Sequence, residues 1–442
     1  MNDTRAVRRS AILEIHARTM ARLDVRRVME MNIRRRGRLL EAWDSTFDLG
    51  AYDRVLALAV GKAAAPMAEG LLQALDCVEG VDALVIAPEI PASQRPGVEY
   101  LKSSHPIPDA SARTAALRAI ERLRGCDART LVFFLVSGGS SAMLELPLPA
   151  GFTDADVADF NRVLVHSGLP IREMNILRKH LSAVKGGRLA VLAGKAAKCT
   201  LVVSDVPSGM EDMVGSGPTL PDSSTVADCQ AILAANPLPF APRVAAWFAD
   251  PALPETPKAG HPAFRNATLQ TVLSSDEMCA FAAEIAVGLG YHVVIDNTCD
   301  EQPFDQAAEH LLARLAGLRL EHAKVCLLSA GEIAVPVSGT PGRGGRNQHF
   351  VLECARRIAA ADERVTVLSA GSDGIDGHSP AAAAVADESS AARASAAGFN
   401  VEAALAGFDS YPLFAALGDA VVTGPSGNNV RDLRILLSVN EQ

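Results

Sequence analysis

The stretch that most constrains the fold is a short apolar segment followed by a loop of glycine and serine. Residues Leu131–Val136 read LVFFLV, six uninterrupted apolar residues that include β-branched and aromatic ones. This pattern is typical of a strand buried on both faces, as in a parallel sheet covered by helices. Directly after the segment come Ser137, Gly138, Gly139, Ser140 and Ser141.

The composition of this loop indicates an anion site. Glycines let backbone N–H groups approach an anion closely, and a following helix N-terminus adds partial positive charge. Three hydroxyls supply further hydrogen bonds. The alternative is an ordinary turn from strand to helix in which a serine is the N-cap. We expect Ser137–Ser141 to contact a substrate or nucleotide.

Two other predicted strands also end in residues suited to phosphate chemistry. The strand Arg54–Val60 is followed by Gly61 and Lys62, and a lysine there can reach a phosphate as a point charge on a flexible stem. An exposed lysine at a helix start is the alternative, although the helix dipole disfavours it. Asp205 follows the strand Thr200–Ser204, at the end where open α/β sheets bind ligands.

Two further segments carry candidate ligand contacts. His105 lies in a proline-stiffened loop and is expected either to touch the substrate or to fix the loop. The segment Leu177–Arg188 holds four cations and a histidine and includes a pair of glycines. We expect it to face an anion through Lys179 and Lys185, the alternative being a solvated helix face.

The second half of the chain repeats the pattern of strands followed by polar loops. The strand Lys324–Leu328 leads to Glu332, which we expect to contact the substrate or nucleotide. Arg346 and Asn347 follow a glycine-rich loop and open a predicted helix. Arginine at a helix N-terminus is unfavourable unless an anion is shared there, which favours a bound phosphate.

A glycine loop with two carboxylates follows the strand Thr366–Leu368. Asp373 and Asp376 lie three residues apart in it, an arrangement suited to Mg²⁺ or to a substrate hydroxyl. The alternative is a turn held by aspartate hydrogen bonds to the backbone. We expect Asp373 and Asp376 to be metal ligands.

The amino-acid composition argues against a nucleic-acid-binding protein and against a membrane protein. A net charge of -9 and only 5% aromatic residues argue against nucleic acid as a partner. The eight cysteines form no C-x-x-C pair and read as reduced thiols. Because no apolar run approaches ~18 residues, we expect no membrane span. The sequence predicts a cytoplasmic protein, a monomer or homodimer, whose partners are small molecules.

The fold class predicted is α/β, with two domains of mainly parallel sheets flanked by helices and an active site in the cleft between them. A chain of 442 residues exceeds the ~250–300 residues at which single cores stop growing. Seven prolines in the segment 236–264 indicate a boundary. We expect an N-terminal Rossmann-like domain over residues 1–262 and a C-terminal domain over 263–442.

Several of these segments together resemble the class II glycerate 2-kinase family, which ends in a MOFRL domain. The similarity extends from about residue 10 to residue 437, with the MOFRL region at about 324–437. Each motif is weak alone, and the combination is specific. The matching pieces are Val60–Ala64, His105–Pro106, Val136–Ser141, Leu177–Ser182, Lys185–Gly187, Ser204–Val206, Gly217–Thr219, Gly344–Gln348, Asp373–Gly377 and Asn428–Val430.

The resemblance implies ATP-dependent phosphorylation of D-glycerate at its 2-hydroxyl, giving 2-phosphoglycerate and ADP, with Mg²⁺. It also implies that the two catalytic cations are Lys62 and Arg346, and we expect Asp205 to act with them. Helix electrostatics alone predicts that losing either cation leaves folding intact or slightly raises stability.

The sequence departs from the family pattern at a few positions. The family's Ser-Gly-Gly-Glu reads Ser329-Ala330-Gly331-Glu332 here, and Ser372 replaces the usual threonine. Asn428 stands where the family's Gly-Thr-Asn-Val pattern has threonine. Ala330 is expected to matter most, because its Cβ would crowd a nucleotide contact.

Two other functions are open alternatives. An NAD(P)H-dependent hydroxypyruvate reductase, a label that members of the family often carry, would need a strand followed by G-x-G-x-x-G. No such fingerprint occurs, since the loop at Gly342 lacks the third glycine and carries arginines. A non-catalytic phosphosugar-binding regulator would need neither Asp205 nor the Asp373/Asp376 loop.

Overall fold

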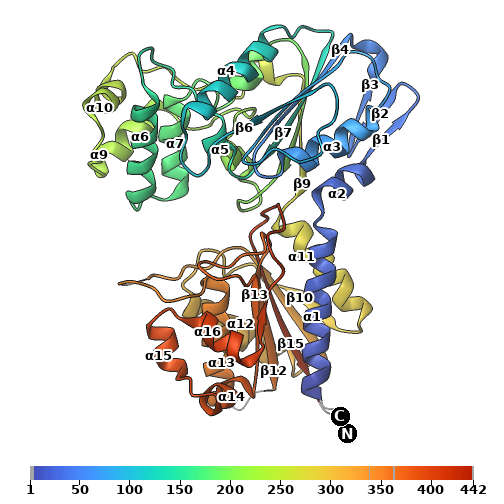
Figure 1. Ribbon diagram of the computed structural model, residues 1–442, viewed down its shortest axis with the longest axis vertical. Helices are drawn as coiled ribbons and strands as arrows, with labels where there is room; N and C mark the ends of the chain where they lie inside the picture. The colour runs from blue at the N-terminus through green and yellow to red at the C-terminus, as the bar shows by residue number, and fades with distance from the viewer. Residues whose placement is uncertain (1–3, 338, 362–363, 441–442) are drawn as a thin grey trace. The chain divides into compact units, whose positions relative to one another are not determined.

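The computed structural model describes residues 4–337, 339–361 and 364–440, and the chain divides into two compact units (Figure 1). Val25–Val272 form one, named here the parallel-sheet unit. Met1–Asp24 and Leu273–Gln442 form the other, the mixed-sheet unit.

This division differs from the predicted boundary at residue 262. The proline-rich segment does not separate the units, because Pro242 opens helix α10 (Pro242–Ala249) at a position where proline is favoured. Phe248 of that helix packs against Phe160 within the parallel-sheet unit. The first helix, α1 (Thr4–Arg22), contacts strands of the mixed-sheet unit instead of the N-terminal domain to which it was assigned.

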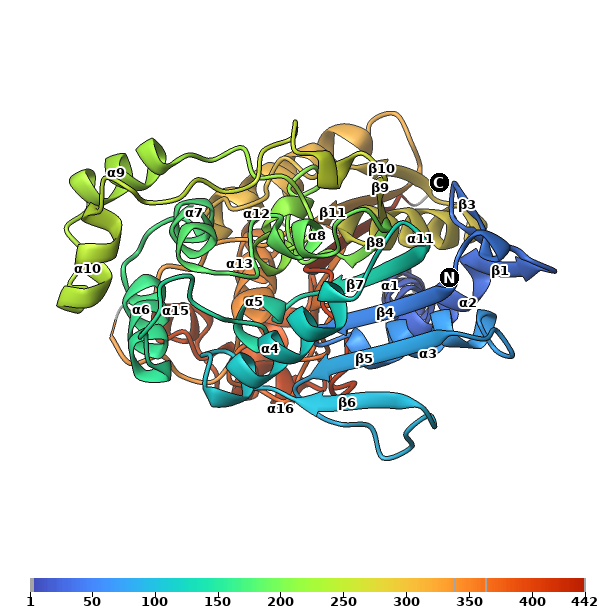
Figure 2. The same cartoon turned by 90° about the horizontal axis from the view of Figure 1, so that it is seen from above.

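The parallel-sheet unit is built on six strands, and Figure 2 shows three of them, β5, β4 and β7, side by side. Every pairing from β6 across to β8 is parallel. In sheet order the strands are β6 (Val98–Lys102), β5 (Val81–Ala87), β4 (Arg54–Val60), β7 (Thr130–Ser137), β8 (Ala197–Val203) and β9 (Ala267–Leu273).

The apolar run Leu131–Val136 lies in β7, between β4 and β8, and every residue of β7 is buried. The predicted central strand is therefore confirmed. A small antiparallel sheet, β1 (Ile33–Arg36), β2 (Leu39–Ala42) and β3 (Ser45–Asp48), belongs to the same unit. The helices are α2 (Val25–Asn32), η1 (Leu49–Ala51), α3 (Ala64–Ala74), α4 (Ala110–Arg124), α5 (Ser140–Met143), α6 (Asp154–His166), α7 (Ile171–Leu181), α8 (Arg188–Leu192), η2 (Glu211–Ser216), α9 (Val226–Ala235), α10 and η3 (Pro262–Phe264).

The mixed-sheet unit also has six strands. In sheet order they are β10 (His292–Ile295), β11 (Lys324–Ala330), β15 (Asp432–Val439), β12 (Val365–Gly371), β13 (Ala383–Asp387) and β14 (Ala420–Val421). Within the ranges that the structure describes, only β10 and β11 pair in parallel. The α/β class is confirmed, and a mainly parallel sheet is found in the first unit but not in this one.

The difference arises from β15, which enters the sheet between β11 and β12 and is antiparallel to both. Since both neighbours oppose β15, β11 and β12 still point the same way. Their carboxyl ends therefore meet at one edge of the sheet, beside the first residue of β15. This edge carries the polar loops predicted after β11 and β12.

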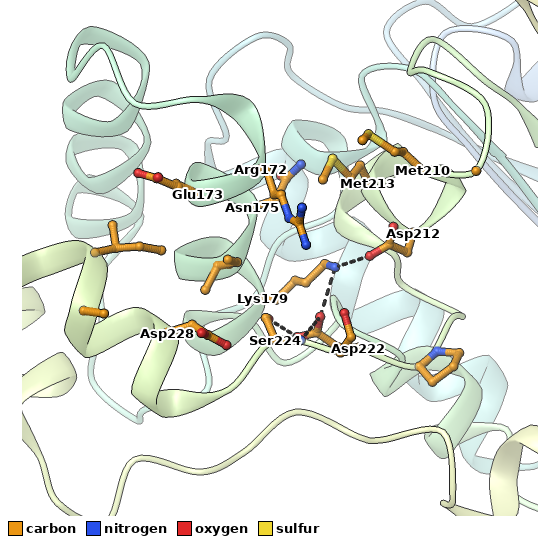
Figure 3. Close-up of a pocket in the computed structure, with 16 residues that line it drawn as sticks. Arg172, Glu173, Asn175, Lys179, Met210, Asp212, Met213, Asp222, Ser224 and Asp228 are labelled. Carbon is orange, nitrogen blue, oxygen red and sulfur yellow. Dashed lines mark hydrogen bonds and ion pairs between the residues drawn. The ribbon is translucent and has the colours of Figure 1, made fainter.

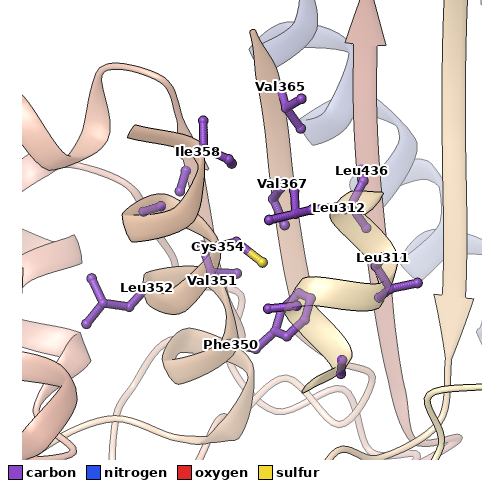
Figure 4. Packing of buried hydrophobic residues seen from close by; sticks show 14 of the residues in the cluster. Leu311, Leu312, Phe350, Val351, Leu352, Cys354, Ile358, Val365, Val367 and Leu436 are labelled. Carbon is purple, nitrogen blue, oxygen red and sulfur yellow. The ribbon is translucent and has the colours of Figure 1, made fainter. Parts of the chain in front are cut away.

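Helices cover this sheet, and its core is apolar. The helices are α1, α11 (Ser275–Gly288), α12 (Phe304–Leu318), α13 (Arg346–Ala361), α14 (Ser390–Ala396), α15 (Val401–Ala406) and α16 (Ser410–Leu417). Figure 4 shows Leu311 of α12 and Phe350 of α13 in the cluster that includes Val367 and Leu436 of the sheet. Across the described residues, no helix is both long enough and apolar enough to cross a membrane.

Candidate active site

The loops that follow β4 and β7 are hydrogen-bonded to each other. The Ala63 N–H donates to Ser137 Oγ (3.0 Å), and the Lys62 N–H donates to the Gly138 carbonyl (2.9 Å). Gly61 has a φ of +122°, and a Cβ there would come within 2.6 Å of the Ser137 carbonyl oxygen. Glycine is therefore required, and the close approach places Lys62, whose side chain is exposed, beside the glycine-serine loop.

Asp205 and His105 border the same loop. A side chain at Gly138 would collide with the Asp205 carboxylate, and a Cβ at Gly139 would lie 3.2 Å from His105 Nε2. Burial lowers the pKa of His105, and the charge of Lys62 lowers it further. The structure thus brings four predicted features together at the carboxyl edge of the parallel sheet.

The two serines that begin α5 differ in their surroundings. Ser140 Oγ is buried and has no hydrogen-bond partner among the described residues. Ser141 Oγ lies 2.9 Å from Ser216 Oγ, which donates to Asn175 Oδ1 (2.9 Å). Ser141 therefore connects the glycine-serine loop to η2 and α7, whereas the Ser140 hydroxyl is enclosed next to Gly215.

In the mixed-sheet unit, Arg346 begins α13 and is held by two carboxylates. Its Nε donates to Asp432 Oδ2 (2.5 Å), and its Nη1 donates to Glu332 Oε2 (2.9 Å). Burial opposes its charge, but Asp432 and Glu332 outweigh burial and raise the pKa of Arg346. Burial raises the pKa of Glu332. The anion expected beside this arginine is therefore supplied by the protein itself.

Comparisons with known proteins agree with this architecture. The model of DUF4147, described as a domain of unknown function, matches residues 11–249, and that of the MOFRL family matches residues 325–432. A D-glycerate 2-kinase of Thermotoga maritima is 33% identical over 393 residues, covering 88% of this chain and 91% of the relative. The chain belongs to the MOFRL-containing glycerate 2-kinase family.

A solved structure and a further relative show a similar extent of similarity. The crystal structure of a glycerate kinase from Thermotoga maritima has a TM-score of 0.82 and 30% identity, covering 97% of this chain and 99% of that one. A protein of Agrobacterium vitis that carries the provisional name hydroxypyruvate reductase is 36% identical over 394 residues. The matched region covers 87% of each chain. Membership confirms the predicted family and the prediction of a kinase.

Asp376, predicted to bind a metal, caps the start of α13. Its two carboxylate oxygens accept the backbone N–H groups of Asn347 (3.1 Å) and Gln348 (2.8 Å), and the amide groups of both side chains also donate to it. Burial raises the pKa of Asp376 despite these bonds. Asn347 is itself buried and accepts from Ser369 Oγ (2.5 Å), so both residues are tied into the helix start.

The carboxylates of this edge do not fit a shared Mg²⁺ cage. Asp373 is half-buried and accepts from the Ile375 N–H (3.1 Å), as in the predicted turn, while Asp376 faces α13. Over residues 4–337, 339–361 and 364–440, no group of three or more His, Cys, Asp or Glu side chains is arranged to hold a metal. The two aspartates thus make separate local bonds.

Lys179 and Lys185 both contact carboxylates inside the parallel-sheet unit. Lys179 Nζ donates to Asp212 Oδ2 (2.9 Å) and Asp222 Oδ1 (3.1 Å), as Figure 3 shows. Lys185 is buried on Glu145, and burial lowers its pKa. The segment is neither a solvated face nor an open row of cations, and a substrate contact by either lysine stays a prediction.

Sequence reasoning missed the acidic partners of the arginines in the mixed-sheet unit. Asp432 begins a strand that was not predicted, although the apolar run after it was the available signal. Asp300 accepts two bonds of 2.6 Å from Arg431, and its Oδ1 also accepts the Glu332 N–H (2.9 Å). The methyl group of Ala330 is buried at the end of β11.

Proposed function

We propose that this protein transfers the γ-phosphoryl group of ATP to the 2-hydroxyl of D-glycerate, giving 2-phosphoglycerate and ADP. The observation that carries the proposal is the cluster of Lys62, the glycine-serine loop and Asp205 at one edge of the parallel sheet. Phosphoryl transfer depends mainly on positioning and charge neutralisation, which this cluster can supply. The glycerate 2-kinases among the relatives support the substrate and the position.

In the proposed reaction, the 2-hydroxyl oxygen forms a bond to the γ-phosphorus while the bond from that phosphorus to the leaving ADP oxygen breaks. The hydroxyl proton passes to the carboxylate of Asp205. Lys62 neutralises charge on the phosphoryl oxygens, and the glycine-serine loop donates hydrogen bonds to the bound anion. These interactions act most strongly in the transition state, where charge spreads over the equatorial oxygens.

Arg346 is proposed as the second cation of the reaction. Asp432 and Glu332 fix the direction of its guanidinium, and its side chain keeps 37% of its exposure while that of Asp432 keeps 2%. A guanidinium can donate five hydrogen bonds, so a ligand can bind without displacing either carboxylate. A bound Mg²⁺ would be held mainly by phosphate oxygens and water, as is common for this ion. A cytoplasmic location is part of the same proposal.

The reductase alternative is supported by the name of the relative from Agrobacterium vitis. A dinucleotide site needs bare glycine backbone where β4 meets its helix, so that the pyrophosphate can approach. In this chain that turn reads Gly61-Lys62-Ala63-Ala64, which lacks the second and third glycines. The turn therefore favours a single phosphate contact through a lysine over a dinucleotide.

The test is a coupled assay with purified protein. ATP should be consumed only when D-glycerate and Mg²⁺ are both present, and phosphorus NMR should show a phosphate ester at position 2. Oxidation of NADH with hydroxypyruvate, without any turnover of ATP, would contradict the proposal.

A further inference from the structure

A separate pocket in the parallel-sheet unit lies between α7, η2 and α9. It has a volume of about 670 Å³ and is lined by residues of these helices and of the loop before α9. Pockets of roughly 300–1,000 Å³ are the size at which small ligands are largely enclosed. None of the residues that line this pocket has a role in the phosphoryl transfer proposed above.

The lining combines an apolar side with a polar one. Met210 and Met213 lie near Asp212 in Figure 3, and Ile176 and Ile232 also line the space. Methionine side chains adapt their shape to flat, polarisable ligands. An apolar side that faces a polar one suits a ligand with a flat apolar part and several hydroxyl or amino groups.

The charge of the lining argues against an anion. Two cationic side chains face four acidic ones, and one of the cations, Lys179, is already bonded to Asp212 and Asp222. A carboxylate such as that of D-glycerate, or a chain of phosphates, would be repelled here. Hydroxyl and amino groups can donate to the acidic side chains.

The pocket connects with the glycine-serine loop through a short chain of hydrogen bonds. Asn175 lines the pocket, its Oδ1 accepts from Ser216 Oγ (2.9 Å), and Ser216 Oγ lies 2.9 Å from Ser141 Oγ. The pocket edge and the glycine-serine loop are thus two side-chain hydrogen bonds apart, a separation that an elongated ligand, uncharged at one end and anionic at the other, could span. We propose that the pocket holds the base and ribose of the nucleoside triphosphate, with the phosphates leading to the glycine-serine loop.

This inference rests on the proposed kinase activity, and its test separates the two. Ala231 lies exposed on α9 at the pocket lining, and Ala234 is exposed on the same helix but does not line the pocket. Ala231→Trp fills the space, and Ala234→Trp is the matched control. Circular dichroism and melting temperature establish that both variants fold.

Isothermal titration should show that Ala231→Trp weakens ADP binding by at least about tenfold, while binding of tripolyphosphate changes by less than about twofold. The KM for ATP should rise by a similar factor, with the KM for D-glycerate unchanged, and Ala234→Trp should behave as the wild type. If the wild type is active and Ala231→Trp binds ADP as tightly as the wild type, the proposed pocket role is wrong and the kinase activity stands. The same conclusion follows if only the KM for D-glycerate rises in the variant. A wild type that neither binds ADP nor phosphorylates D-glycerate overturns both.

Discussion

At the scale of single residues, the charge of Lys62 affects the protonation of His105. Burial and then the charge of Lys62 lower the pKa of His105, so its imidazole is held neutral beside the glycine-serine loop. A neutral ring can donate or accept a hydrogen bond but adds no charge to an incoming phosphate. The cation of this cluster is therefore Lys62.

Replacing Lys62 should remove catalysis without unfolding the protein. We expect Lys62→Ala to lower kcat by about 10²-fold or more, roughly 2.7 kcal/mol of transition-state stabilisation. The melting temperature should stay near that of the wild type, because the side chain is exposed. The control is Lys102→Ala, at the end of β6 in the same sheet, where the lysine pairs with the exposed Glu89.

The same variant tests the proximity of the two residues. Since removing a nearby cation favours the imidazolium form, the pKa of His105 should rise in Lys62→Ala, as measured by NMR of the labelled ring. An unchanged pKa of His105 would show that Lys62 points elsewhere. Near-wild-type kcat in the folded variant would refute its catalytic role.

Arg346 differs from Lys62 because its loss leaves a buried carboxylate without its partner. Arg346→Ala leaves the buried Asp432 carboxylate without its guanidinium donors, which should lower the free energy of unfolding by about 1–3 kcal/mol. These bonds oppose the gain in stability that helix electrostatics alone predicts for this residue. In urea titrations, the double variant Arg346→Ala/Asp432→Asn should recover part of the loss, and no recovery would argue against the pairing.

At the scale of elements, the beginning of α13 depends on Asp376. Asp376→Asn replaces an acceptor oxygen with an NH₂ group facing N–H donors, so the free energy of unfolding should fall by about 1–3 kcal/mol. Asp373→Asn is the matched comparison, since Oδ1 can still accept from the Ile375 N–H. Urea unfolding and a Mg²⁺ titration of kcat measure both variants. A stable Asp376→Asn with altered Mg²⁺ dependence would support the metal role and argue against the capping role.

The elements that sequence reasoning identified are those with an uninterrupted apolar signal. The strands β4, β7, β8 and β11 and their polar ends were predicted because each run stays apolar until its loop. The strand β15 was missed because Arg434 interrupts its apolar run. That arginine is fully buried and donates to the Gly331 carbonyl (3.0 Å), a long-range contact that no local pattern reveals.

The predicted site residues follow the same rule. Lys62, the glycine-serine loop and Asp205 could be placed together because parallel strands bring their carboxyl ends to one edge. The bonds of Lys179 and Asp376 could not be predicted, because each depends on carboxylates or N–H groups contributed by distant segments or by helix geometry. Charge and spacing along the chain indicate candidate ligand-binding residues. Only the fold shows which of them are already bonded to other groups of the protein.

At the scale of the whole molecule, α1 contributes to a unit whose other elements follow the parallel-sheet unit in sequence. Arg8 is fully buried, its Nε donates to Thr366 Oγ1 (3.1 Å), and its Nη2 donates to both oxygens of Glu388 (2.6 and 2.7 Å). The helix also packs against β12 and β15. Arg8 therefore anchors the first helix to the mixed sheet.

Arg8→Ala should destabilise one unit and spare the other. We expect a loss of about 1–3 kcal/mol, because buried Thr366 and partly buried Glu388 lose their donor. Hydrogen exchange should rise in β12 and β15 but not in β4 and β7. Arg18→Ala, which removes an exposed pair with Glu14, should change stability by less than about 0.5 kcal/mol. Equal exchange increases in both sheets would contradict the division.

The position of β15 has a consequence for biosynthesis. This strand lies inside the mixed sheet, yet it follows every other strand of that sheet in the chain. During translation, β11 and β12 are synthesised before β15, the strand that pairs with both. By then all the residues of the parallel-sheet unit have been synthesised. The unpaired edges of β11 and β12 are then open to aggregation, so chaperones should bind released chains truncated before residue 432 more than released chains that include β15.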